Sequence, residues 1–221
     1  MARLQAQRSG CKDVFHAFLV KNADYEGYDE IPVLKPTYIL PNRIITFSKA
    51  LRSQDYDQWV CFYEDDVAFD RLWNNPVKYL PILKRFYGVI TPDFSLYRDM
   101  PLCMQKWNIY RSRAIGVWLQ EKGVKVIPNI RWADYRTHRT ACLGILTHSV
   151  ISIGSHGALK DVISRKDFIA GLEYVIHTLS PSGIVVYGAM PEAIFGKYKN
   201  TGITIIQFEA AITQIHKAGD A

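Results

Sequence analysis

The residues with the clearest potential for chemistry lie between Asn129 and Asp134, in the sequence N-I-R-W-A-D. They follow a short β-branched run, Val124–Ile127, which is bounded by Gly123 and Pro128 and is typical of a buried parallel strand. In parallel α/β folds, ligands bind at the carboxyl ends of the strands. An amide, a guanidinium, an indole and a carboxylate at this position therefore indicate a site, without fixing its reaction.

Arg131 and Trp132 are the most informative pair in this segment. An arginine suits bidentate contact with a carboxylate or a phosphate, and an indole suits stacking on a base. Together with Asn129, they form the core of the predicted ligand-binding set. The structural alternative is that Trp132 packs under a loop while Arg131 pairs with Asp134 or Asp93.

Acidic side chains follow two other predicted strands. Glu64, Asp65 and Asp66 come after one of them, and Asp93 comes after the next. Hard divalent cations such as Mg²⁺ and Mn²⁺ prefer oxygen ligands. We therefore predict Asp65, Asp66 and Asp93 as metal ligands, with magnesium as the cofactor that they would take. The alternative is that the three consecutive acids cap the following segment or stay solvated.

A glycine-rich tetrapeptide, Gly154-Ser155-His156-Gly157, follows another predicted strand. Glycines in this position let backbone N–H groups turn towards an anion, so Gly154, Ser155 and Gly157 are predicted to bind phosphate. Tyr187 ends a further strand and joins the ligand-binding set. The tetrapeptide matches neither a P-loop nor a G-x-G-x-x-G motif, and a plain turn is the alternative.

Acid–base or metal-assisted chemistry is predicted for Asp93, Asp134 and His156, which follow three different strands. The sequence contains no G-x-S-x-G, no H-E-x-x-H and no catalytic cysteine signature, which argues against the commonest hydrolase classes but not against enzymes in general. Arg111 and Arg113 lie two positions apart on a long predicted helix, so they point to different faces. A solvated position is expected for both.

The elements that must position these residues alternate between strands and helices. The predicted strands are Arg43–Phe47, Trp59–Tyr63, Gly88–Thr91, Val124–Ile127, Ser149–Ile153, Gly183–Tyr187 and Ile203–Phe208, after a short one at Ile31–Leu34. The predicted helices are Lys49–Ser53, Pro76–Phe86, Pro101–Lys122, Ser164–Leu179 and Pro191–Phe195, with a short one within Tyr135–Ile145 and a helical tail. Cys103, Trp107, Tyr110, Ala114 and Val117 are predicted to form the core face of the longest helix.

About seven strands alternating with helices predict an α/β fold with a mostly parallel sheet and right-handed crossovers. We expect an incomplete, β/α-barrel-like arrangement, with an open doubly wound sheet as the alternative. The five central strand runs are expected to pair in one sheet. Residues 1–221 are predicted to form a single α/β domain, with 1–43 as an irregular lead-in segment packed across it.

Composition sets the remaining bounds. A formal charge of +6 and a pI of about 9.1 favour an anionic partner, either a small molecule or a nucleic acid, although no polybasic arm is present. The four cysteines form no C-x-x-C and are expected to be buried free thiols in a reducing cytoplasm. Neither a signal-peptide h-region nor a transmembrane stretch is recognised, so no membrane partner is expected.

Several segments together resemble one known family. They are T-P-D-F-S-L-Y at 91–97, R-S-R-A-I-G-V-W-L at 111–119, V-I-P-N-I-R-W at 126–132, G-S-H-G at 154–157 and V-V-Y-G-A-M-P at 185–191, with E-I-P at 30–32 and I-I-Q-F at 205–208. In combination they are similar to the bacterial, plasmid and phage family catalogued as domain of unknown function 4417. The resemblance spans nearly the whole chain. It implies a single compact domain carried by mobile elements and a context of replication or host–phage conflict, and it assigns no activity, cofactor or catalytic residue.

The leading hypothesis is a mobile-element protein that binds or processes a phosphorylated ligand at the carboxyl mouth of the sheet. A nucleotide or a nucleic-acid end is the expected ligand; if the protein is an enzyme, the chemistry is phosphoryl or nucleotide chemistry. The alternative is a non-catalytic accessory factor that binds DNA or a host protein through its basic surface. A deep polar pocket would favour the first, and a flat basic face the second.

Overall fold

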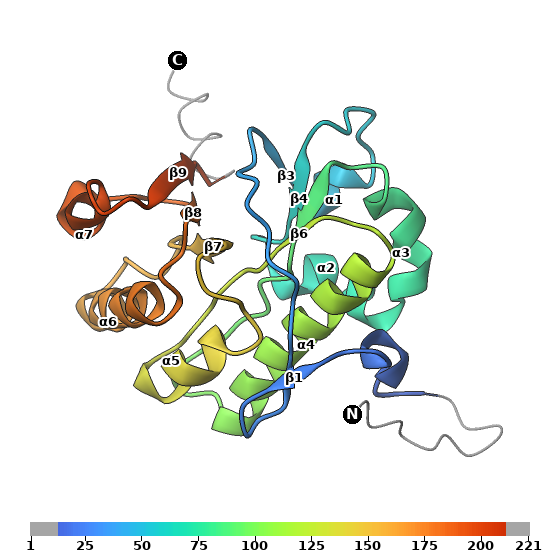
Figure 1. The fold of residues 1–221 in the computed structure, drawn as a ribbon, viewed down its shortest axis with the longest axis horizontal. Helices are drawn as coiled ribbons and strands as arrows, with labels where there is room; N and C mark the ends of the chain where they lie inside the picture. Colours follow the sequence, from blue (N-terminus) through green and yellow to red (C-terminus); the bar gives the residue numbers. More distant parts are fainter. Residues whose placement is uncertain (1–12, 211–221) are drawn as a thin grey trace.

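From β3 onward, parallel strands alternate with helices, as predicted (Figure 1). The structure is a computed structural model that describes residues 13–210. Its strands are β1 (Tyr25–Glu26), β2 (Ile31–Pro32), β3 (Ile44–Thr46), β4 (Trp59–Cys61), β5 (Gly88–Ile90), β6 (Val126–Ile127), β7 (Val150–Gly154), β8 (Gly183–Tyr187) and β9 (Thr204–Phe208). Its helices are η1 (Ala17–Val20), α1 (Phe47–Ala50), α2 (Asp66–Asn74), α3 (Pro76–Leu83), α4 (Leu102–Glu121), α5 (Tyr135–Cys142), α6 (Val162–Leu179), α7 (Glu192–Phe195) and η2 (Gly196–Tyr198).

The strands form two parallel sheets, in the order β3-β4-β5-β6 and β7-β8-β9, beside the small antiparallel pair β1-β2. The prediction of one sheet for the five central runs is therefore wrong. One isolated parallel bridge, between Asn129 and Ser152, connects the two sheets. The pairing does not extend further because the N–H of Val150, at the start of β7, donates to the carbonyl of Thr37 in the lead-in segment at 2.8 Å. The lead-in segment thus occupies hydrogen-bonding positions that β6 would need.

Helices cover only one face of this curved, two-part sheet. Side chains alternate along each strand, and in β4 Val60 points outward while Trp59 and Cys61 point inward. The inward side chains form a cluster of strand and loop residues that includes Ile90 and Ile127 and no helical residue. A doubly wound fold would place helices on both faces. The arrangement is therefore barrel-like and incomplete, because within residues 13–210 no ladder joins β9 to β3.

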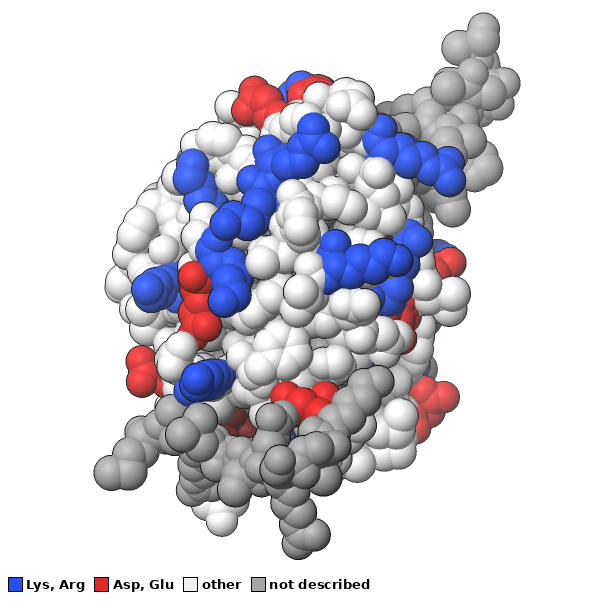
Figure 2. All heavy atoms as spheres, turned by 90° about the vertical axis from the view of Figure 1, so that its right-hand side faces the viewer, with Lys and Arg blue, Asp and Glu red and all other residues white. Residues whose placement is uncertain are grey.

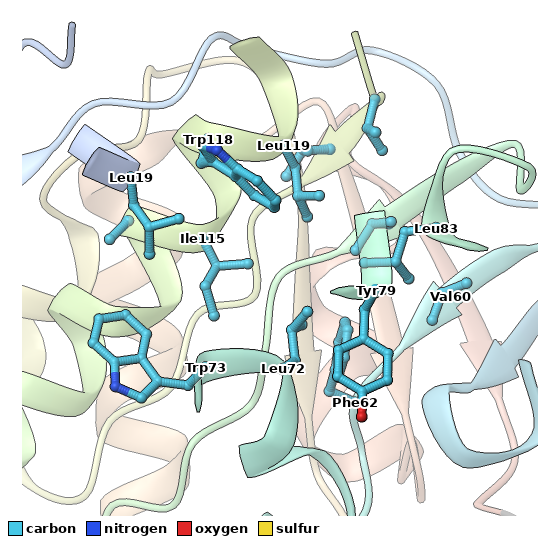
Figure 3. Packing of buried hydrophobic residues seen from close by; sticks show 14 of the residues in the cluster. Leu19, Val60, Phe62, Leu72, Trp73, Tyr79, Leu83, Ile115, Trp118 and Leu119 are labelled. Carbon is cyan, nitrogen blue, oxygen red and sulfur yellow. The ribbon is translucent and has the colours of Figure 1, made fainter. Parts of the chain in front are cut away.

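The outward face of the first sheet packs against α2, α3 and α4 (Figure 3). Phe62, Leu72 and Leu83 are fully buried, and Ile115 and Trp118 of α4 close the cluster from the other side. Removing a large apolar side chain from water contributes about 1.5–3 kcal/mol. This cluster therefore fixes β4 and β5, whose carboxyl ends carry site residues.

The predicted core face of the long helix α4 is confirmed in its second half, where Ala114 and Val117 are buried, and is wrong in its first half. Cys103 is exposed and Trp107 is 38% exposed, whereas Gln105, Asn108 and Ser112 are buried. Hydrophobic periodicity failed in the first half because it buries polar side chains that bond to backbone. The amide of Asn108, for example, donates to the carbonyl of Ser95 at 2.7 Å.

Other boundaries differ from the predicted ones in informative ways. The helix α2 was not predicted. The helix α6 begins at Val162, two residues before the predicted start at Ser164, because Asp161 caps it and accepts from the backbone of Ile163 and Ser164. Cys61 and Cys142 are buried as expected, and burial raises the pKa of each thiol to about 12. The predicted helical tail and Cys11 lie outside the described residues.

No helix within residues 13–210 is both long enough and apolar enough to span a bilayer.

Gly171, in the middle of α6, gives a test of the packing between this helix and the loop after β6. A Cβ at Gly171 would lie 2.0 Å from Nε1 of Trp132. Alanine normally stabilises a helix interior relative to glycine by about 1 kcal/mol. The clash of the added Cβ with Trp132 should outweigh this gain in helix propensity. Gly171→Ala should therefore lower the free energy of unfolding by about 1–3 kcal/mol, as measured by urea denaturation.

The matched control is Ala170→Gly, at an exposed neighbouring position of the same helix. It should cost about 1 kcal/mol through helix propensity alone. A Gly171→Ala protein more stable than the parent would contradict the close approach of Trp132.

Candidate functional site

Asn129 lies where the two sheets meet, and every one of its polar groups is hydrogen-bonded. Its backbone N–H donates to Oγ1 of Thr91 at 2.8 Å, and its backbone carbonyl accepts from Nη1 of Arg113 at 2.8 Å. Its side-chain carbonyl accepts from the hydroxyl of Tyr63 at 2.9 Å, and its amide donates to Oδ1 of Asp93 at 2.7 Å. Because the residue is only 3% exposed, these bonds fix which way the amide points.

Asp93 is the next member of this network. It is 8% exposed, and its second oxygen accepts a hydrogen bond from Nη1 of Arg131 at 2.5 Å in an ion pair. Burial raises the pKa of Asp93, while the Arg131 charge and the Asn129 hydrogen bond act in the opposite direction. Burial alone would lower the pKa of Arg131, but the Asp93 carboxylate raises it above its ordinary value. Arg131 therefore stays charged.

Tyr63, two residues after the end of β4, completes the inner wall. Its hydroxyl lies 2.5 Å from Oγ of Ser152, and its ring stacks on that of Tyr187 with centroids 4.5 Å apart. Burial raises the pKa of Tyr63 well above its usual range, so it acts as a neutral hydroxyl. A Cβ at Gly154 would come within 3.1 Å of the Tyr63 ring, which explains why glycine ends β7.

A cavity of about 500 Å³ opens beside this network. Five of the predicted site residues line it: Arg131, Trp132, Gly154, His156 and Gly157. Residues that sequence reasoning did not select complete the lining: Leu96, Tyr97, Arg98, Asp99, Ile130, Ala133, Ala158, Ser164, Asp167 and Phe168. The cavity thus joins the carboxyl ends of β6 and β7 to the first turns of α6.

Arg131 presents donors to this cavity. Its side chain is 31% exposed, and only Nη1 is engaged, by Asp93. Nε and Nη2 make no hydrogen bond to any residue between 13 and 210. Arg98, also in the lining, is paired with Asp167 at 3.4 Å. Arg131 is therefore an anchored guanidinium with two N–H groups available to a ligand.

Trp132 is packed more tightly than a stacking platform needs to be. Its side chain lies against Phe168, with ring centroids 5.5 Å apart, and Nε1 donates to the backbone carbonyl of Asp167 at 3.1 Å. The residue is 9% exposed. Base stacking by Trp132 stays a prediction, and the packing observed here matches its structural alternative.

Asp134 and Ser155 are engaged elsewhere. Asp134 caps α5 and accepts hydrogen bonds from the backbone and guanidinium of Arg136, which lower its pKa. Ser155 is buried. Its backbone N–H donates to the carbonyl of Tyr187, and its hydroxyl donates to the carbonyl of Ala189. Neither residue lines the cavity. In the predicted phosphate nest, the backbone N–H groups still unbonded to described residues are those of His156 and Gly157.

The acids after β4 do not assemble with Asp93. Asp66 accepts from the N–H and hydroxyl of Ser95, Asp65 is exposed at the start of α2, and Glu64 accepts from the N–H of Ser48. Within residues 13–210, no three His, Cys, Asp or Glu side chains are grouped so that they could hold a metal ion. The magnesium site therefore stays a prediction, which the geometry of Asp93 does not support.

Arg111 and Arg113 are not solvated, so that prediction is wrong. Arg113 is 1% exposed, and its guanidinium donates to the carbonyls of Asn129, Ala141 and Leu143. Burial lowers its pKa to about 10. Arg111 pairs with Asp70 and lies over the Phe94 ring. The error arose because α4 is covered from two sides, by the first sheet and by α5.

Sequence reasoning also missed Tyr63 and Ser152 as members of the network. The signal for Tyr63 was present, since strand alternation places it on the same face as Trp59 and Cys61. Ser152 is a lone hydroxyl within the apolar run V-I-S-I, and a polar group buried in a strand needs a partner.

Comparison with known proteins agrees with the resemblance seen in the sequence. The family model described as "Domain of unknown function (DUF4417)" matches residues 23–209. The chain belongs to this family. Its relatives include two proteins called "Gene 1 protein", from Mycobacterium phages D29 and L5. No solved structure matches the chain.

The two phage relatives are 32% and 33% identical to the chain, each over 165 residues and 73% of its length. The matched region spans 61% of the D29 protein, so the chain covers less than two thirds of that relative, and 72% of the L5 protein. The family therefore includes proteins encoded by mycobacteriophages.

Replacing Asn129 tests the network directly. Asn129→Leu keeps the branching at Cγ but leaves one Asp93 oxygen without its partner, at about 1–3 kcal/mol for the unsatisfied group, while the Tyr63 hydroxyl keeps only Ser152. Asn129→Asp instead places a second carboxylate against Asp93, which raises the pKa of one of the two. Its deficit in unfolding free energy should therefore be small near pH 4 and grow as the pH rises towards about 7.

The control is Asn200→Asp, at an exposed position, which should change stability by less than about 0.5 kcal/mol at either pH. If Asn129→Asp unfolds at the same urea concentration as the parent at neutral pH, the contact between Asn129 and Asp93 is not as described.

Proposed function

We propose that the cavity binds the phosphate group of a nucleotide or of a nucleic-acid end, in a protein of mobile-element origin. The observation that carries this proposal is the state of Arg131. Its charge is maintained by buried Asp93, its orientation is fixed through Nη1, and its Nε and Nη2 donors have no partner in the described part of the chain. Two parallel N–H donors on a rigid fork match two oxygens of a phosphate.

The rest of the lining suits the same ligand. His156 and Gly157 line the cavity, and their backbone N–H groups, which bond to no described residue, are the candidate anion donors at the end of β7. Leu96, Ile130 and Phe168 supply an apolar wall for a sugar or a base. About 500 Å³ lies within the range of small-ligand pockets.

Among the residues predicted for acid–base work, His156 has the suitable position. It is exposed and lines the cavity, whereas Asp93 is committed to Arg131 and Asn129. Asp134 is committed to Arg136. We infer that Asp93 positions Arg131, and that any proton transfer to a bound phosphate ester involves His156.

The test compares adenosine monophosphate with adenosine in thermal-shift and calorimetric titrations. The nucleotide should raise the melting temperature and the nucleoside should not. Arg131→Lys should weaken nucleotide binding by about 10-fold or more, since an ammonium cannot reproduce the fork. The double variant Asp93→Asn/Arg131→Gln should abolish binding yet fold, because it removes both charges of the pair together.

Lys197→Gln, on the exposed surface, is the control and should bind as the parent does. Equal responses to nucleotide and nucleoside, or full affinity in the double variant, would contradict the proposal.

A further inference from the structure

We propose that a second surface, distinct from the cavity, binds the phosphate backbone of a nucleic-acid strand. This basic face is formed by cationic side chains of α1, α2 and α3 and of the turns that follow them. It consists of Lys49, Arg52, Arg71, Lys78, Lys84 and Arg85. All six are exposed. The proposal goes beyond the cavity function, because it concerns the phosphates along a nucleic-acid chain and not the phosphate at its end.

The basic face carries charge that the protein itself does not neutralise. None of its six cations forms an ion pair with a described residue, whereas Arg43, Arg98 and Arg131 each have a carboxylate partner. Residues 47–54 and 71–92 contain no aspartate or glutamate. Figure 2 shows the consequence on the side of the molecule that carries α3, where blue side chains cross the face and red ones lie mainly towards its margins.

The face is hollowed at its most basic point. A depression of about 690 Å³ is lined by Ser48, Lys49, Leu51, Arg52, Ser53 and Arg71. Arg71 lies over the Phe47 ring at 5.4 Å, which holds its guanidinium beside α1. The nearby carboxylate of Glu64 accepts the N–H of Ser48. Three cations and two hydroxyls around one concavity suit successive phosphates.

The chemistry favours a nucleic acid over a membrane. Surfaces that bind anionic membranes insert bulky apolar side chains beside their basic ones. The lining of the hollow holds a single aliphatic residue, Leu51, which is half-buried. Neutralising phosphates by lysine and arginine releases counterions, which makes such binding steeply dependent on salt.

The experiment measures fluorescence anisotropy of a labelled single-stranded DNA of about 20 nucleotides, from about 50 to 300 mM salt. The parent should bind with a salt-dependent dissociation constant. Lys49→Gln/Arg52→Gln/Arg71→Gln should raise that constant about 10-fold or more at low salt. It should also reduce the slope of log K against log salt by about two, since each cation lost contributes about 0.7 on a single strand. Arg52→Lys/Arg71→Lys, which keeps the charges, should bind within about threefold of the parent.

The matched control is Lys166→Gln/Lys197→Gln/Lys199→Gln, which removes the same charge from α6 and η2 at the opposite end of the molecule (Figure 1). It should change binding by about twofold or less. Equal losses in the two triple variants would mean that net charge alone is sensed, and would overturn the proposal.

Two further outcomes would also overturn it. One is an absence of salt-dependent DNA binding by the parent. The other is binding to vesicles with anionic phospholipid that the first triple variant loses while keeping its affinity for DNA. Arg131→Lys separates this proposal from the cavity function when the oligonucleotide carries no terminal phosphate, since it should then leave oligonucleotide binding intact even where nucleotide binding is lost. If Arg131→Lys abolishes DNA binding and the triple variant does not, the strand binds at the cavity and the basic face has no such role.

Discussion

The hydrogen bonding of Asn129 is the constraint on which the rest of the site depends. Asn129 lies at the bridge that joins the two parallel sheets within residues 13–210, where the backbone of Ser152 donates to Pro128 and accepts from Ile130. Its side chain joins Tyr63 to Asp93. Buried polar groups must be paired in a low-dielectric interior, so these contacts permit very little displacement of one sheet relative to the other. The guanidinium of Arg113 also stabilises this junction, because it donates to the backbone carbonyls of Asn129, Ala141 and Leu143. It forms no ion pair with a residue between 13 and 210.

The junction around Asn129 connects the arrangement of the two sheets to the geometry of the candidate site. The incomplete barrel brings the carboxyl ends of β5, β6 and β7 to one edge, which is where α/β proteins place ligands. The same network then fixes Asp93, and Asp93 fixes one edge of the Arg131 guanidinium. A binding group held by a buried partner loses little conformational entropy when a ligand arrives. The guanidinium of Arg131 is therefore held in one orientation at the cavity by residues that do not line it.

Much of the architecture was predictable, because β-branched runs bounded by glycine and proline survive as parallel strands. Gly183–Tyr187 is a strand over the predicted span, and the barrel-like alternative was favoured correctly over the doubly wound one. The division into two sheets was not predictable, since it depends on Thr37 bonding to Val150 across a long stretch of sequence. Periodicity likewise could not reveal a helix that buries polar groups, as α4 does with Asn108 and Arg113.

The position of the candidate site was predictable from the sequence, but the role of each of its residues was less so. Strand-end reasoning placed Asp93, Asn129 and Arg131 together, and the structure bonds them directly. It could not show that Asp134 pairs with Arg136 or that Ser155 bonds to Ala189, because both depend on backbone geometry that follows the strands. Trp132 is a further example, because it follows β6 but packs against Phe168 of α6.

The central claim is that the free edge of Arg131 binds a phosphate group. The most direct measurement is the ¹⁵N–¹H resonance of the Arg131 Nε–H, assigned by comparison with Arg131→Lys, during titration with adenosine monophosphate. The account predicts a saturable shift of this resonance with the nucleotide and none with adenosine. A resonance that stays fixed at saturating nucleotide, while those of Arg52 or Arg71 move, would contradict it.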